Sequence, residues 1–186
     1  MGFSLNIKSS NSSGLALTEM WDAVGAFEET PSMRALEYAP HFTFAIYDTD
    51  NVRETTRENA IERAARGETE LRLRFDRIAV FEGPSLVLWA DPGPRTALLQ
   101  MHKAIHDVID PLLCRPYYRP GFWVPHCTLG MNIRQDRRAE AMAFVENFRG
   151  GVEAVFDVID CVTFPPLRVT AERRLPSLLD PLPAAP

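Results

Sequence analysis

Two short segments, "APHFTFAI" at residues 39–46 and "VPHCTLGM" at residues 124–131, share one arrangement of residue types. Each has a proline, a histidine, an apolar residue and a threonine inside an otherwise apolar run. Successive side chains of a β-strand point to opposite faces, so a spacing of two places the histidine and the threonine on the same face. We therefore predict two strands that each present a polar pair to a cleft while the intervening residue packs in the core. The four polar residues are His41, Thr43, His126 and Thr128.

The segments around these motifs predict alternating strands and helices. Apolar alternation and turn residues predict strands at 3–7, 41–47, 71–81, 85–90, 123–133, 153–164 and 167–175. Apolar residues at helical spacing predict helices at 17–27, 50–67, 94–113 and 138–148. Each half of the chain therefore has strand, helix and strand segments together with one histidine motif, which indicates a coarse duplication.

Length and charge limit the possible partners. A chain of 186 residues with 46% hydrophobic residues is long enough to bury a core and short enough for one domain. Its 20 basic and 25 acidic residues give a net charge of −5, so no overall positive field attracts an extended duplex. Any anion site must be built locally. A small or terminal phosphate is therefore favoured, and we expect a monomer.

The cysteines and the first residues indicate a cellular location. Three cysteines without paired spacing fit reduced thiols better than disulfides or a zinc site. The start "MGFSLNIKSS" has no signal-peptide core, and Asn6 stands where an N-myristoylation motif has Ser or Thr. No apolar run reaches the length of a membrane span. We therefore expect a cytoplasmic protein without a membrane partner.

Two histidine and threonine pairs suit chemistry at one phosphorus atom. A histidine with a pKa of about 6.5 can act as a base when neutral and as an acid when charged. The threonine hydroxyls can donate to the non-bridging oxygens, where charge develops. We predict metal-free opening of a cyclic phosphodiester. One histidine deprotonates the attacking water, and the other protonates the departing ribose oxygen.

The motifs "PHFTF" and "PHCTL" resemble those of the two-histidine (2H) phosphoesterases, which include 2'-5' RNA ligases and RNA 2',3'-cyclic phosphodiesterases. The resemblance implies one domain at 1–175 with an α+β fold, in which two pseudo-symmetric lobes of antiparallel sheets with outer helices flank a central cleft. The Pro-rich tail at 176–186 lies outside it. The resemblance also implies no metal or cofactor, and a nucleotide or RNA terminus with a cyclic phosphate as substrate. Catalytic roles fall to His41 and His126, and phosphate contacts fall to Thr43 and Thr128.

The cation that binds the substrate is not identified by the resemblance. Relatives often have a basic residue soon after the second motif, whereas here Gly130 and Met131 follow and the nearest arginine is Arg134. The loop "CRPYYRPGFW" at 114–123 is a second candidate, because aromatic faces stack on bases and arginines hold phosphates. Its aromatic residues could equally cover the core. The candidate substrate residues of this loop are Arg115, Tyr117, Tyr118, Arg119, Phe122 and Trp123.

Other polar residues have simpler interpretations. His102 and His106 are four residues apart on the third helix, but "HKAIH" has no Glu after the first histidine and no third ligand. We expect both to be solvated residues beside the apolar stripe. Arg72 and Arg74 alternate with apolar residues and are expected on a solvated sheet face.

Two alternative functions stay open. In one, the cleft is a non-catalytic binding module that holds a nucleotide without turnover. In the other, the protein is a scaffold with a relic cleft, a reading favoured if the loop aromatics form an exposed patch. Neither the natural substrate nor which histidine is the base follows from the sequence.

Overall fold

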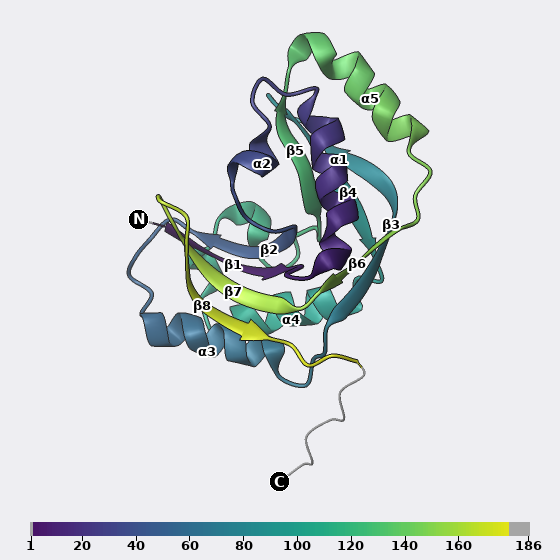
Figure 1. Ribbon diagram of the computed structural model, residues 1–186. Coiled ribbons are helices and arrows are strands. Elements are labelled where there is room, and N and C mark those ends of the chain that lie inside the picture. Colours follow the sequence, from purple (N-terminus) through teal and green to yellow (C-terminus); the bar gives the residue numbers. More distant parts are fainter. Residues whose placement is uncertain (1, 179–186) are drawn as a thin grey trace.

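The computed structural model describes residues 2–178, in which two four-stranded antiparallel sheets form the centre of the molecule (Figure 1). Most of the predicted Pro-rich tail, residues 179–186, lies outside the described residues. In sheet order, the first sheet contains β2 (His41–Tyr47), β1 (Gly2–Lys8), β7 (Val158–Phe164) and β8 (Arg168–Arg174). In sheet order, the second sheet contains β5 (Cys127–Ile133), β4 (Leu86–Gly93), β3 (Leu71–Phe81) and β6 (Val152–Phe156).

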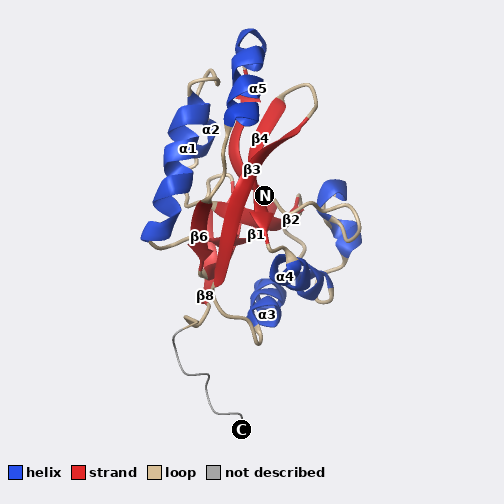
Figure 2. Cartoon of the chain, turned by 90° about the vertical axis from the view of Figure 1, so that its right-hand side faces the viewer, coloured by secondary structure: helices blue, strands red, loops and turns tan. Residues whose placement is uncertain are grey.

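Helices cover the outer face of each sheet (Figures 1 and 2). The first sheet is covered by α3 (Glu54–Ala65) and α4 (Thr96–His106). The second sheet is covered by α1 (Leu15–Gly25), α2 (Ser32–Ala35) and α5 (Arg138–Asn147). Single turns of 3-10 helix lie at Ser12–Gly14, Pro111–Leu113, Pro116–Tyr118 and Gln135–Arg137. The predicted α+β class with two antiparallel sheets and outer helices is confirmed.

The two sheets do not correspond to the two halves of the chain. The first sheet takes β1 and β2 from the beginning of the chain and β7 and β8 from its end, whereas the second takes the strands between them. Helix α1 follows β1 in the sequence but packs against β5 and β6 of the second sheet. The sheets therefore do not follow the division into halves that the sequence indicates, but each sheet contains one motif strand, β2 or β5.

Two predicted elements are shorter in the structure, and each has a proline near its new limit. The helix predicted at 94–113 is α4, which ends at His106, and a separate 3-10 turn begins at Pro111. The missing N–H of Pro111 prevents one helix from running unbroken to residue 113. The strand predicted at 123–133 begins at Cys127, because Pro125 has no N–H to donate to the ladder. His126 thus lies immediately before β5.

The residues between each histidine and threonine pack in the core, as the alternation predicts. Phe42 and Cys127 are fully buried. The ring of Phe42 lies 6.3 Å from that of Phe75 and 4.8 Å from that of Phe156, centroid to centroid. These contacts join β2 of the first sheet to β3 and β6 of the second. The same alternation that turns Phe42 inward turns its neighbours toward the cleft.

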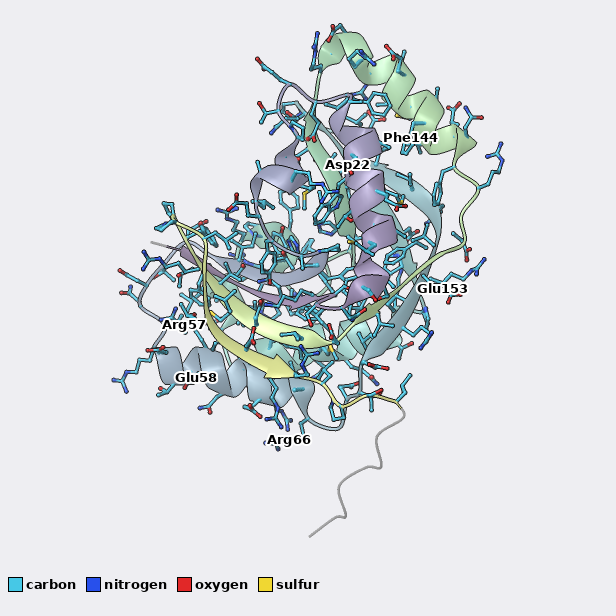
Figure 3. All side chains as sticks on the ribbon, in the orientation of Figure 1. Asp22, Arg57, Glu58, Arg66, Phe144 and Glu153 are labelled. Atoms are coloured by element: carbon cyan, nitrogen blue, oxygen red, sulfur yellow. The ribbon has the colours of Figure 1, made fainter. Side chains whose placement is uncertain are left out.

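Charged residues cover the outside of the helices. Glu58 and Arg66 are exposed, and in Figure 3 they lie on the outer side of α3. Arg72 and Arg74 are also exposed, as predicted for a solvated sheet face. Among residues 2–178, no helix has both the length and the apolar composition needed to cross a membrane.

Candidate active site

Both motif histidines are held by the same local hydrogen bond. The Nδ1 atom of His41 lies 2.8 Å from the carbonyl oxygen of Ala39, and that of His126 lies 2.7 Å from the carbonyl oxygen of Val124. A carbonyl oxygen only accepts, so Nδ1 carries a hydrogen in both rings. The second nitrogen, Nε2, is therefore left in both rings to exchange a proton with a ligand.

Both motif threonines are also held by the same kind of contact. The strands that contain them, β2 and β5, are edge strands, which leave backbone groups unpaired. The indole nitrogen of Trp123 donates to the carbonyl of Thr43 at 2.9 Å, and that of Trp21 donates to the carbonyl of Thr128 at 3.0 Å. Each edge strand is therefore fixed at its threonine by a tryptophan from outside its own sheet.

The two motif strands, β2 and β5, contact each other. Each motif lines its own cavity beside this contact. His41 and Thr43 line a cavity of about 360 Å³. His126 and Thr128 line a second cavity of about 560 Å³.

We call His41, Thr43 and their surroundings the first half-site. Behind it lies a polar network centred on a fully buried carboxylate, Asp160. The Thr43 hydroxyl donates to Asn6 Oδ1 at 3.0 Å, and Asn6 Nδ2 donates to Asp160 at 3.1 Å. The Tyr38 hydroxyl donates to the same carboxylate at 2.6 and 2.7 Å. Lys8 Nζ forms an ion pair with it at 2.8 Å.

His126, Thr128 and their surroundings form the second half-site, which is aromatic. The rings of Phe81 and Trp89 lie 5.0 and 6.0 Å from the His126 ring, centroid to centroid. The cavity beside them is also lined by Tyr117 and Phe122, which are 83% and 72% exposed. Aromatic side chains that are exposed next to a cavity are available to stack on a flat ligand.

Burial controls the protonation of both histidines. Desolvation lowers the pKa of His41, while the Ala39 carbonyl and the Asp160 charge act in the opposite direction. Desolvation also lowers the pKa of His126, opposed by the Val124 carbonyl. Both rings therefore favour the neutral form near pH 7. A phosphate anion placed between them would favour the charged form of one of them.

The predicted arginines are engaged away from the two cavities. Arg115 forms an ion pair with Asp48 at 2.6 Å, and Arg119 donates to the carbonyls of Leu112 and Cys114. Arg134 pairs with Asp136 at 2.6 Å, beyond the end of β5 that is far from His126. The structure therefore does not bring these three predicted substrate residues to the motifs.

The predicted loop aromatics divide into two groups. Tyr117, Tyr118 and Phe122 line the cavity that contains His126. Trp123 is only 8% exposed and packs in the core, where its ring lies 5.6 Å from that of Phe44. The loop thus contributes both a cavity wall and a buried anchor.

The prediction that His102 and His106 are solvated is wrong. They are only 5% and 9% exposed because loop 114–123 folds over this side of α4. Their Nε2 atoms lie 2.8 and 3.1 Å from the carbonyl oxygen of Tyr118, and the His102 ring stacks on Trp123 at 4.4 Å. The two histidines hold the loop. Among residues 2–178, no group of three His, Cys, Asp or Glu side chains is arranged to bind a metal.

Sequence reasoning did not identify the network behind the first half-site. Its members come from three separate segments, with Asn6 in β1, Tyr38 before β2 and Asp160 in β7. The available signal was a polar residue inside an apolar strand, as in "FSLNI" and "VIDCV". Such residues are buried only with partners. The sequence does not show which partners meet.

Comparisons with known proteins concern the sequence and the fold of this chain. Residues 39–163 match the sequence profile of the 2'-5' RNA ligase superfamily. The structure is similar to TT0787 of Thermus thermophilus, with 17% identity, a TM-score of 0.64, and coverage of 96% of this chain and 100% of that one. The comparison with curated protein sequences gives no match.

Two further solved structures are similar. Usb1 of Kluyveromyces marxianus is 12% identical with a TM-score of 0.52, and the match covers 94% of this chain and 97% of that one. A protein described as a phosphoesterase is 13% identical with a TM-score of 0.56, and the match covers 95% of this chain and 100% of that one. At these identities the likeness shows the fold. The profile match includes both histidine motifs and more than half of the chain, so this protein belongs to the 2'-5' RNA ligase superfamily, the 2H phosphoesterases.

Proposed function

We propose that this protein opens a 2',3'-cyclic phosphodiester at the end of a nucleotide or an RNA, without a metal ion or cofactor. The observation that carries this proposal is the matched pair His41 and His126, each with Nδ1 bound to a carbonyl and Nε2 left for a ligand, at the starts of two edge strands that contact each other. Two such groups on either side of one phosphorus can act as base and acid in the same step.

The proposed reaction balances without a further reagent. One histidine accepts a proton from water as the water oxygen bonds to phosphorus. The bond from phosphorus to one ribose oxygen breaks, and the other histidine donates its proton to that oxygen. The product is a ribose phosphomonoester. A ribose hydroxyl in place of water would instead form a 2'-linked phosphodiester by the same proton transfers.

The threonines and the aromatic wall supply the remaining interactions. Thr43 and Thr128 are expected to donate to the non-bridging phosphate oxygens, which gain charge in the transition state. Phe122 and Tyr117 line the second cavity and are exposed, which suits stacking on the base of a nucleotide. This arrangement serves a terminal nucleotide rather than an extended duplex.

Two features of the chain support a proposed location and assembly. Cys114, Cys127 and Cys161 are free and buried, as expected for a protein of the reducing cytoplasm. We propose that the protein acts there as a monomer, since residues of one chain supply both half-sites.

A substrate panel tests this proposal directly. The four 2',3'-cyclic nucleotides and a 2'-5' linked dinucleotide are incubated with the protein in EDTA, and products are separated by chromatography. We expect phosphomonoester products despite the chelator, because the proposed acid and base are protein side chains. Activity lost in EDTA and restored by zinc or manganese would contradict the mechanism. Tight nucleotide binding without turnover of any substrate would support the alternative, a non-catalytic binding module.

The pH dependence gives a second test. We expect kcat/KM to follow a bell-shaped profile, because one ring must be neutral and the other charged. Burial lowers the pKa of both rings, so the maximum is expected on the acid side of the ordinary histidine value of about 6.5. The two apparent values belong to the coupled pair. A profile that is flat from about pH 5 to about pH 8 would exclude this acid and base pair.

A further inference from the structure

One buried carboxylate is connected to both functional side chains of the first half-site. Asp160 is fully buried, and it is surrounded by the donors Lys8, Asn6 and Tyr38. A buried charge is strongly unfavourable unless it is paired and hydrogen-bonded. Here the partners come from β1 and from the segment before β2, so the carboxylate fixes segments that are distant in the sequence.

The first connection runs to the motif threonine. Asn6 donates to Asp160 with Nδ2, so its Oδ1 faces the other way and accepts the Thr43 hydroxyl. An amide turned over would present its oxygen to the Asp160 carboxylate and would lose that hydrogen bond. The Thr43 side chain is thereby held from Asp160 until its hydroxyl turns to a phosphate oxygen.

The second connection runs to the motif histidine. The Tyr38 hydroxyl donates to both carboxylate oxygens of Asp160, and the Tyr38 ring meets the His41 ring edge to face at 4.8 Å between centroids. The hydrogen bonds fix the tyrosine, and the tyrosine forms one wall of the histidine site. His41 is thus held by Ala39 at Nδ1 and by Tyr38 at its ring.

We infer that Asp160 is a positioning residue of the first half-site: through Asn6 and Tyr38 it holds Thr43 and His41 in place for the reaction. This inference rests on the proposed function and deepens it. Asp160 is fully buried and has no part in binding substrate directly. Its effect is therefore expected in the catalytic step rather than in substrate affinity.

The carboxylate also acts on His41 through its charge. The charged or titratable groups that act on this ring are Asp160, Lys8 and His126, and the Asp160 charge favours the protonated ring while the other two oppose it. Glu172 adds a second carboxylate to Lys8 at 3.2 Å. Removal of the Asp160 charge would leave Lys8 without its closest partner, and both changes disfavour the protonated form of His41.

The decisive variant is Asp160→Asn, which keeps the shape of the side chain. Its amide nitrogen would face donors where a carboxylate oxygen accepted them, so at least one partner loses its bond. The matched control is Asp157→Asn. Asp157 is another buried carboxylate, bonded to the Ser10 backbone and hydroxyl at 2.7 and 2.9 Å and to Arg174 at 2.7 Å, and it lines neither cavity of the site.

Two measurements are made on folded protein, which is verified by circular dichroism. For Asp160→Asn we expect kcat to fall about 10- to 100-fold on a 2',3'-cyclic nucleotide, because small displacements of reacting groups cost that much. We expect KM to change less than about threefold. The titration of the His41 ring, followed by NMR, should move to lower pH. Asp157→Asn should change neither kcat nor the His41 titration.

The outcomes separate this inference from the proposed function. A folded Asp160→Asn protein with unchanged kcat and an unchanged His41 titration would overturn the positioning role, while wild-type activity would leave the proposed function intact. If the wild type opens no cyclic phosphate, the proposed function fails, but the His41 titration still tests the connection to Asp160.

A second variant covers the case in which Asp160→Asn does not fold. Asn6→Ala removes the link to Thr43 and keeps the carboxylate. We expect kcat to fall without a change in KM, and the Asn6→Ala and Thr43→Ala effects to be much less than multiplicative in the double variant. Effects that multiply would show that Asn6 does not act through Thr43, and would overturn the first connection.

Discussion

The His41 ring lies against a tyrosine that binds a buried carboxylate, whereas the His126 ring lies against Phe81 and Trp89. Yet both rings make the same hydrogen bond to the backbone, from Nδ1 to the carbonyl two residues earlier. The carbonyl of each motif threonine also accepts a tryptophan indole N–H. The two half-sites therefore offer a ligand the same atoms, a histidine Nε2 and a threonine hydroxyl. They differ in the residues that surround the histidine ring, which are polar in the first and aromatic in the second.

This difference indicates a division of work. Polar groups with charged partners restrict orientation, because hydrogen bonds depend on direction. Aromatic walls tolerate many ligands, because every base has a flat face. We therefore expect the first half-site to hold the reacting phosphate in place and the second to accept the base or the leaving group. The variants below test whether both half-sites contribute to the catalytic step and whether the second contributes more to substrate affinity.

The largest expected effect tests whether both histidines are needed for the catalytic step. His41→Ala and His126→Ala should each lower kcat/KM by about 10²- to 10⁴-fold, because each removes one proton transfer. The double variant should lose much less than the product of the two, since the rings act as a unit. Steady-state kinetics on one cyclic nucleotide measures all three. One histidine variant with full activity would show that the half-sites do not share a phosphorus atom.

The threonines should be unequal. Thr128→Ala is expected to lower kcat by about 10- to 1000-fold, because the variant loses a hydrogen-bond donor to the negative charge that develops in the transition state. Thr43→Ala should cost less, because the Thr43 hydroxyl must exchange its bond to Asn6 for one to phosphate, and an exchange gains less free energy. The same kinetic assay compares them. A larger loss in Thr43→Ala would reverse this order and show that giving up the Asn6 bond does not weaken the contact of Thr43 with phosphate.

Substrate affinity should depend on the second half-site. Phe122→Ala should raise KM for a cyclic nucleotide by about 5- to 100-fold, the usual contribution of one stacked base, with kcat little changed. Leu167→Ala is a suitable control, because Leu167 is exposed and lines the cavity of the first half-site. If both variants change KM equally, the aromatic wall has no special role.

The smallest expected effect concerns His102, which holds loop 114–123 against α4. Burial lowers the pKa of His102 to about 4, whereas a histidine in an unfolded chain has a pKa of about 6.5. Between these values the unfolded chain binds the extra proton, so the free energy of unfolding falls as the pH falls. His102→Phe keeps a ring against Trp123 and removes the titrating group.

Urea denaturation of both proteins at about pH 7 and about pH 4.5 measures this effect. The variant should lose less unfolding free energy between the two pH values than the wild type does. Its stability at pH 7 should be lower, because the bond to the Tyr118 carbonyl is gone. An equal pH dependence of the two proteins would show that the His102 ring is hydrated in the folded state.

Strong local patterns made much of this protein predictable. Residues 41–47 and 71–81 were predicted as strands and form β2 and β3 with the same limits. In both, apolar residues alternate with other residues for part of the strand. Strand geometry alone sends successive side chains to opposite faces, so this pattern is visible without knowledge of distant contacts. The two motifs could be located for the same reason, since a histidine and a threonine two residues apart share a face in any strand.

Patterns that depend on distant contacts were not predictable. The burial of His102 and His106 depends on loop 114–123, and an isolated helix gives no sign of what covers its flank. The arginines of that loop were expected near phosphate but pair with local partners, as Arg115 does with Asp48. Short-range spacing contains no information about which charge will be nearest in the folded chain.

The sequence by itself determined the two motif strands, the faces of their residues and the membership of the superfamily, because these depend on residues that are neighbours in the chain. Only the tertiary structure decided that the first sheet joins the beginning of the chain to its end. That pairing places Asp160 of β7 beside Asn6 of β1. A buried charge must find its partners across the sheet, and those partners are fixed by strand order rather than by local sequence.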